Sequence, residues 1–121
     1  MLKSLQDEEV LRERITSYWN YKTKGDYVKT YLYEDPLFRK TISMTTYIQN
    51  YGSPAMTYTS FEVQDVRLND AEHAEVKIKA GVRLKVPGAK AFEHETELTE
   101  LWARVDGEWY HVPKGKKSLA Q

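Results

Sequence analysis

The chain has 121 residues, enough for one domain with a hydrophobic core and too few for two comfortable ones. Lys plus Arg and Asp plus Glu both number 18, so the formal net charge is zero and the basic excess typical of nucleic-acid binding is absent. There is no cysteine, which excludes disulfides, thiol catalysis and cysteine-ligated metals.

Apolar residues in the first half of the chain recur with the period of a helix. Between about Asp7 and Thr23 they form a single stripe, made of Leu11, Ile15, Tyr18 and Trp19. The acidic residues at positions 7–9 would then lie in the first turn, where carboxylates meet the positive end of the helix dipole. We therefore predict a first helix from about residue 7 to residue 23.

Two more helix starts follow. Asp26, after Gly25, can cap a short second helix. Asp35-Pro36 combines a cap residue with proline at the first helical position, and Gly52 with its neighbours ends the third helix. We expect three helices before the strands begin.

After Pro54 the period of the apolar residues changes from that of a helix to that of a strand. The first strand changes parity near Gln64-Asp65, which predicts a β-bulge. The next run, from Ala74 to Val86, has the cleanest alternation in the chain. These patterns predict two neighbouring strands, the first of them bulged.

Two turns then organise the last strands. Pro87-Gly88 turns the chain back into a long strand over Phe92 to Val105. Asp106-Gly107 supplies the positive φ angles of a tight hairpin, and its register places Trp102 opposite His111. We predict a four-stranded, mainly antiparallel sheet.

The register of the second and third strands can be predicted from charge. When Arg83 lies opposite Glu93, Lys79 lies opposite Glu97, and one face becomes a ladder of opposite charges. The other face is apolar and includes His94. We interpret the charged face as solvated surface, with dimer contacts as the alternative.

Two segments have a distinctive pattern of turn and aromatic residues. They are the helix-turn-helix Tyr18-Trp19-Asn20 to Gly25-Asp26-Tyr27, and the closing Trp102-x-Arg104-x-Asp106-Gly107-x-Trp109. Together with the order of helices and strands, from about Leu11 to Val112, they resemble the nuclear transport factor 2-like superfamily. This is the cone-shaped α+β fold of ketosteroid isomerase-like and polyketide cyclase-like proteins.

The resemblance implies a definite architecture. We expect an α+β fold with three N-terminal helices packed in the concave face of a strongly curved, bulged, mainly antiparallel sheet. One domain would cover 1–113, followed by a basic C-terminal tail over 114–121. The family also implies a pocket at the wide end of the cone and a homodimer through the outer face of the sheet.

Enzymes of this superfamily use an aspartate base, an aspartate–histidine pair, or a tyrosine with a protonated carboxyl group. The first catalytic candidate here is His94, on the apolar strand face, although such a histidine is also typical of a hydrogen-bonded core residue. Glu100 would share this face unless a bulge lies between Leu98 and Leu101, and Asp65 lies at the other predicted bulge. No position matches a known catalytic set residue by residue, so the resemblance assigns none.

Tyrosine is concentrated in the helices and the first strand, where eight of the nine lie. A tyrosine can line a half-polar cavity, and it equally suits the edge of a core. The candidates for lining a ligand pocket are Tyr18, Tyr31, Tyr47, Trp102, Trp109 and His111. Metal-ligand spacings, phosphate loops and nucleophile elbows are absent from the sequence, so we expect no metal and no cofactor.

No apolar run approaches the ~20 residues that span a bilayer. Residues 1–9 lack the apolar centre of a signal peptide, so we expect a cytoplasmic protein without membrane contact, unless an export signal has been removed.

Three functions fit these features. The first is binding of a small, partly apolar molecule in the pocket. The second is a lyase or isomerase that transfers protons with His94 and a nearby carboxylate. The third is an interaction or dimerisation module, for which the interior would be filled and an apolar patch exposed.

Overall fold

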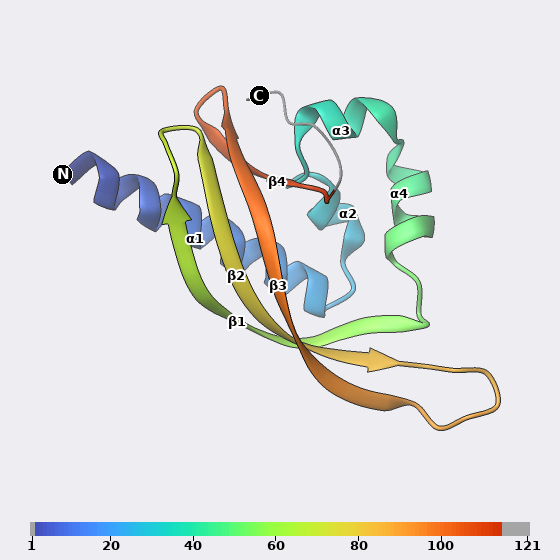
Figure 1. Ribbon diagram of the computed structural model, residues 1–121. Helices are drawn as coiled ribbons and strands as arrows, with labels where there is room; N and C mark the ends of the chain where they lie inside the picture. Colours follow the sequence, from blue (N-terminus) through green and yellow to red (C-terminus); the bar gives the residue numbers. More distant parts are fainter. Residues whose placement is uncertain (1, 115–121) are drawn as a thin grey trace.

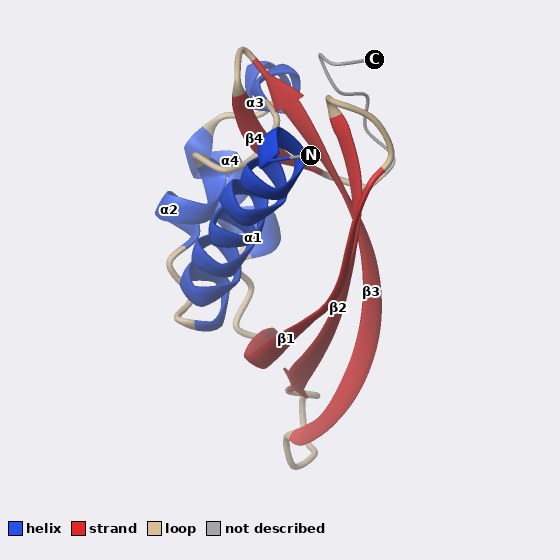
Figure 2. Ribbon diagram, turned by 90° about the vertical axis from the view of Figure 1, so that its left-hand side faces the viewer, coloured by secondary structure: helices blue, strands red, loops and turns tan. Residues whose placement is uncertain are grey.

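The computed structural model describes residues 2–114, which form helices and one antiparallel sheet. The elements are α1 (Leu2–Thr23), α2 (Tyr27–Tyr31), α3 (Pro36–Thr41), α4 (Met44–Tyr51), β1 (Met56–Leu68), β2 (His73–Leu84), β3 (Phe92–Val105) and β4 (Glu108–Val112). The strand order is β1-β2-β3-β4, and the sheet is not closed. Figures 1 and 2 show the helices on the concave side of a strongly curved sheet, which confirms the predicted α+β architecture.

The apolar stripe of α1 is buried as predicted, since Leu11, Ile15 and Trp19 have no exposed surface. The helix begins at Leu2, five residues earlier than about Asp7, and its first turn holds no acidic residue. No glycine or proline interrupts 2–7, so the helix can extend through them.

The predicted third helix is two helices. Ile42 has extended backbone between α3 and α4, and Ser43 begins α4 by accepting a hydrogen bond from the backbone N–H of Thr46. The Tyr31 hydroxyl donates to the Ile42 carbonyl at 2.7 Å, which holds the break in place. The predicted caps Asp26 and Asp35 are confirmed.

The register of the sheet agrees with the charge ladder, because Arg83 pairs with Glu93 and Lys79 with Glu97. The strand β1 has the predicted irregularity between Val63 and Asp65, and a second one between Tyr58 and Ser60.

The bulge considered between Leu98 and Leu101 does not form, since β2 and β3 pair without a shift in register. Glu100 therefore points inward beside Trp102, where two indole N–H groups hydrogen-bond its carboxylate.

The closing hairpin has the predicted geometry. Asp106 and Gly107 have φ angles of 51° and 82°, and Trp102 pairs with His111. On its other edge, β4 makes a parallel bridge to the loop before α3: the Asp35 N–H donates to the His111 carbonyl, and the His111 N–H donates to the Tyr33 carbonyl. This bridge places the side chain of Glu34 beside His111.

Burial separates two parts of the sheet. Where the helices cover the sheet, the core between them includes Trp19, Trp102 and Trp109, each at most 1% exposed. The β2–β3 hairpin extends past the helices, and its end, residues 84–94, is called the distal arm below (Figure 2). Phe92 on the distal arm is 51% exposed.

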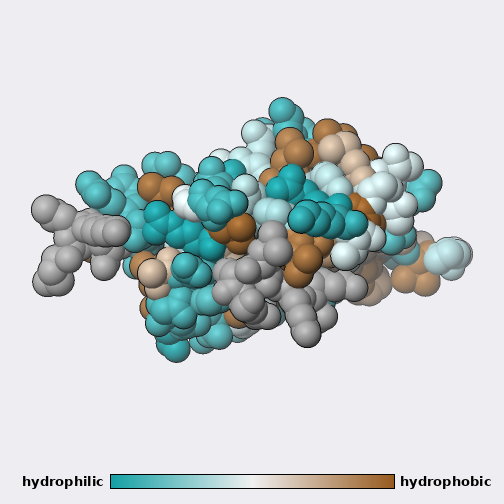
Figure 3. Space-filling view, turned by 90° about the horizontal axis from the view of Figure 1, so that it is seen from above, coloured by the Kyte–Doolittle hydropathy of each residue, from teal (hydrophilic) through white to brown (hydrophobic). Residues whose placement is uncertain are grey.

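Hydrophobic residues are interspersed among hydrophilic ones on the face seen in Figure 3. Within 2–114, no helix is long and apolar enough to cross a membrane. Of the predicted basic tail, Lys114 is exposed, and 115–121 lie outside the described residues.

Candidate functional site

Glu34 is the centre of a buried polar cluster between the helices and β4. It is 2% exposed, although carboxylates are rarely buried unless they are paired. The Nδ1 atom of His111 donates to its Oε1 at 2.6 Å, and the hydroxyls of Tyr18 and Tyr47 both donate to its Oε2 at 2.8 Å. Thr30 in turn bonds the Tyr47 hydroxyl at 2.9 Å. The carboxylate of Glu34 thus joins α1, α2, α4 and β4.

A second carboxylate lies on the other side of the same imidazole. Glu100 accepts hydrogen bonds from the indole N–H groups of Trp19 and Trp102, at 3.1 Å and 3.2 Å. Its other oxygen, Oε2, lies 3.4 Å from Nε2 of His111. The imidazole ring of His111 therefore lies between two buried carboxylates.

The charges in this cluster favour one another. Burial tends to raise the pKa of Glu34, but the charge and the hydrogen bond of His111 outweigh this effect, and the pKa lies below its ordinary value. Burial tends to lower the pKa of His111, but Glu34 and Glu100 raise it above its ordinary value. The structure therefore favours an ionised Glu34 and a protonated His111.

The two tyrosines of the cluster are donors. Burial and the nearby carboxylate of Glu34 raise the pKa of Tyr18 and of Tyr47 far above the ordinary value of a phenol. Both phenols therefore stay protonated at neutral pH, and their hydrogen bonds to Glu34 are of the stronger, charge-assisted kind.

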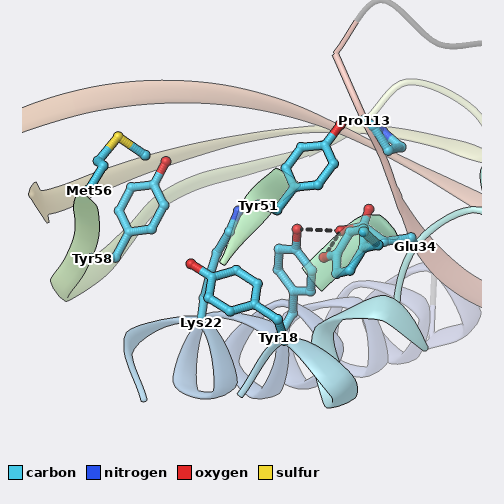
Figure 4. A pocket seen from close by; sticks show the side chains of 9 residues that line it. Tyr18, Lys22, Glu34, Tyr51, Met56, Tyr58 and Pro113 are labelled. Atoms are coloured by element: carbon cyan, nitrogen blue, oxygen red, sulfur yellow. Dashed lines mark hydrogen bonds between the residues drawn. The ribbon is translucent and has the colours of Figure 1, made fainter. Parts of the chain in front are cut away.

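A cavity of about 90 Å³ adjoins the cluster (Figure 4). Tyr18 and Lys22 rise from α1 into this space, and Glu34 lines it from the other side. Five of the lining residues are tyrosines: Tyr18, Tyr27, Tyr47, Tyr51 and Tyr58.

A larger groove of about 420 Å³ lies next to the cavity. Glu100 and His111 contribute polar atoms to the groove, and much of its remaining wall is apolar. Lys22, Tyr58 and Pro113 line both spaces, so the groove and the cavity adjoin each other.

Lys22 is the cation at the junction of the two spaces. Its ammonium lies over the rings of Trp19, Tyr18 and Tyr58, at 4.6, 4.8 and 5.2 Å from their centroids. Such cation–π contacts stabilise an ammonium that has no carboxylate partner. Among the described residues, Lys22 makes no ion pair, although its charge contributes to lowering the pKa of Glu34.

Four of the six residues predicted to line a pocket meet at this cluster: Tyr18, Tyr47, Trp102 and His111. The other two do not. Tyr31 packs against Tyr47, but its hydroxyl donates to backbone carbonyls, and Trp109 lies in the core.

Of the three catalytic candidates, Glu100 alone lies in the cluster. Asp65 is exposed at the bulge of β1. His94 lies opposite Val82, as the predicted pairing of Arg83 with Glu93 requires, but it is exposed on the distal arm, where its ring stacks on Phe92. The helices do not reach this far along the sheet (Figure 2), so the imidazole enclosed by the fold is His111 rather than His94.

Sequence reasoning did not find Glu34 or Lys22. Lys22 does continue the apolar stripe of α1, three residues after Trp19, so a cation at a core-facing position was a usable signal. Glu34 lies in a short loop beside the cap residue Asp35, and no local pattern distinguishes it from a solvated acidic residue. Among the described residues, no group of three or more histidines and carboxylates could hold a metal ion.

No protein-family model matches the sequence, and no curated protein is detectably similar to it. Solved structures do match. A proposed dehydratase of the NTF2-like family from Streptomyces avermitilis has a TM-score of 0.60 at 11% identity, over 92% of this chain and 98% of that one. An NTF2-like protein of unknown function from Shewanella oneidensis MR-1 has a TM-score of 0.55 at 13% identity, over 86% and 93%.

The chain has the nuclear transport factor 2-like fold. A third structure of this kind, the CaMKII hub homology domain of Chlamydomonas reinhardtii, has a TM-score of 0.56 at 19% identity, over 87% of this chain and 92% of that one. One of these structures is a proposed dehydratase, one has an unknown function and one is a hub homology domain, and fold alone does not assign a function. The function of this NTF2-like chain must therefore be argued from its own residues.

Proposed function

We propose that this NTF2-like domain binds a small, partly apolar molecule in the cavity and groove beside Glu34 and His111. The observation that carries the proposal is a buried ionic cluster that adjoins open space. Burying two carboxylates and an imidazole is costly, and a buried ion pair is weak support for stability alone. A concave, mainly apolar site with a few convergent polar groups is typical of ligand binding.

The space beside the cluster also supports one candidate function over another. An interaction module would have a filled interior, whereas this site has a cavity of about 90 Å³ and a groove of about 420 Å³. The space therefore supports ligand binding over the interaction module.

A native mass spectrum of freshly purified protein tests the proposal. We expect a reproducible small extra mass on the wild-type protein, reduced in the Lys22→Met variant because Lys22 lines both spaces. Glu93→Gln, on the exposed distal arm, is the matched control and should retain the mass. A bare wild-type protein would contradict the proposal.

The same spectrum reports the oligomeric state. We propose a homodimer through the outer face of the sheet, where charges of both signs lie side by side and can pair across a two-fold axis. Within one chain, Lys79 and Glu95 form an ion pair of opposite charges at 3.1 Å. A monomer at micromolar concentration would contradict this arrangement.

A second candidate function is proton transfer by a lyase or isomerase, with the protonated His111 as the proton donor in place of His94, and Glu100 as the nearby carboxylate that accepts a proton. The supporting observation is the 2.6 Å hydrogen bond from Nδ1 to Glu34, which fixes the orientation of a ring that lines the groove. Incubation of the retained molecule with the protein in D₂O should then place deuterium on carbon, and His111→Gln should abolish the exchange. No exchange with wild-type protein would exclude this activity for that molecule.

A further inference from the structure

We propose that the molecule bound in the groove is a monocarboxylic acid with an apolar chain, and that Lys22 Nζ and His111 Nε2 bind its carboxylate. This assignment rests on the proposed function and adds the chemical class of the ligand. The ligand class is inferred from the polar groups of the site: some already hydrogen-bond other groups of the protein, and others are available to a ligand.

Most donors of the cluster are committed to its own carboxylates. The hydroxyls of Tyr18 and Tyr47 donate to Glu34, and the indole N–H groups of Trp19 and Trp102 donate to Glu100. A ligand that used one of these donors would remove a hydrogen bond from a buried carboxylate, which costs free energy. They are therefore poor candidates for recognising a ligand.

Two cationic donors of the cluster remain, and a third cation, Lys114, lines the groove from an exposed position. Lys22 makes no hydrogen bond or ion pair with the described residues, and its ammonium lies on aromatic faces. The nearest charged partner of His111 Nε2 is Glu100 Oε2, at 3.4 Å, an ion-pair distance with no hydrogen bond. Both Lys22 and His111 line the groove.

Charge selects the ligand class. The carboxylate of Glu34 balances the charge of His111 through its contact with Nδ1. The carboxylate of Glu100 interacts both with His111 and with two indole N–H groups. A ligand amine would meet the Lys22 ammonium and the His111 imidazolium, and like charges repel. A neutral ligand would not use Lys22 as an ionic partner, whereas a carboxylate can accept from both cations in charge-assisted bonds.

The rest of the groove suits a hydrocarbon chain. Leu98, Val112 and Pro113 supply apolar wall beside the two cationic donors. The volume of about 420 Å³ lies within the range of ligand pockets, roughly 300–1,000 Å³. A chain of several carbons attached to the carboxylate can therefore be accommodated.

The test compares hexanoate with its neutral isostere hexanamide by isothermal titration calorimetry on the full chain. We expect hexanoate to bind at least tenfold more tightly than hexanamide. Lys22→Met, which keeps the aliphatic packing and removes the charge, should weaken hexanoate at least tenfold and leave hexanamide within twofold. Lys22→Arg should stay within threefold of wild type, and Lys29→Met, on an exposed position of α2, should leave both unchanged.

The outcomes separate this inference from the proposed function. Equal binding of hexanoate and hexanamide, or hexanoate binding that Lys22→Met leaves intact, would overturn the carboxylate assignment while small-molecule binding stands. Binding of neither probe would also overturn the assignment, and the native mass spectrum of the purified protein then decides the proposed function separately.

Discussion

His94 and His111 lie on neighbouring strands of one sheet. Each has two neighbouring glutamates, but those of His94 are neighbours in sequence and those of His111 are neighbours in space. The neighbours of His94 are Glu93 and Glu95, adjacent in sequence and therefore directed to the opposite face of β3. The neighbours of His111 are Glu34 and Glu100, brought to its two ring nitrogens by the fold. The glutamates adjacent to His94 in sequence leave its ring exposed, whereas long-range contacts enclose His111 in a charged cluster.

The difference arises from the reach of the helices. They cover the sheet at β4, where Tyr47 is 2% exposed, and they end before the distal arm, where Phe92 is 51% exposed. Burial lowers the effective dielectric constant, so charges near His111 interact strongly and those near His94 are screened by water. The predictions below contrast the two regions.

The largest expected effect is from Glu34→Gln. The change leaves a buried imidazolium without its 2.6 Å partner, and removal of one partner of a buried pair typically destabilises a protein by about 3 to 5 kcal/mol. Urea unfolding monitored by tryptophan fluorescence measures the loss. Glu93→Gln on the distal arm should leave the free energy of unfolding unchanged. An equal loss in both variants would contradict a stabilising role of the buried contact between Glu34 and His111.

Tyr47→Phe should destabilise the protein by about 1.5 to 3 kcal/mol, because it removes a hydrogen bond to an ionised carboxylate. Tyr51→Phe is the matched control on the same helix: Tyr51 is 46% exposed, and its hydroxyl has no hydrogen bond to a described residue. Thermal unfolding followed by circular dichroism compares the two variants. Similar melting temperatures for both would mean that the Tyr47 bond contributes little.

Glu34 and His111 should make the stability of the protein depend on pH. The pKa of Glu34 is lowered from 4.5, so its contribution is fully present above pH 4.5 and is lost as the pH falls through the folded-state value. The pKa of His111 is raised from 6.5 by Glu34 and Glu100, against burial and Lys22. Its contribution is therefore fully present below pH 6.5 and is lost as the pH rises through the folded-state pKa.

We expect His111→Gln to remove the decline of stability above pH 6.5, and His94→Gln to retain it. Urea unfolding of wild type and both variants across this range is the measurement. A wild-type profile that His111→Gln leaves unchanged would contradict the charged state assigned to the cluster.

The sheet could be predicted from sequence because its signals are local. The Pro87-Gly88 and Asp106-Gly107 turns, together with the alternation from Ala74 to Val86, predict a register that one residue of slip would invert. The parity change at Gln64-Asp65 likewise identified a bulge that β1 contains. In contrast, the break at Ile42-Ser43 depends on a tertiary hydrogen bond from Tyr31, which no helical period encodes.

The candidate site could be predicted only in part, for the same reason. Tyr18, Tyr47 and His111 were found because aromatic and imidazole groups stand out in the sequence. Glu34 was missed, because its role depends on a parallel bridge to His111, 77 residues away in the chain. The sequence did not decide whether Glu100 faces the interior, because its burial depends on two indole donors that an apolar pattern does not include.

The most direct test of the central claim is the ring ¹H–¹⁵N NMR spectrum of the histidines at pH 6.5. The contacts with Glu34 and Glu100 predict that His111 carries protons predominantly on both ring nitrogens, with the Nδ1 proton shifted by its 2.6 Å bond to Glu34. Glu34→Gln should abolish that shift. A predominantly neutral His111 in the wild-type protein, with one protonated nitrogen, would contradict the account.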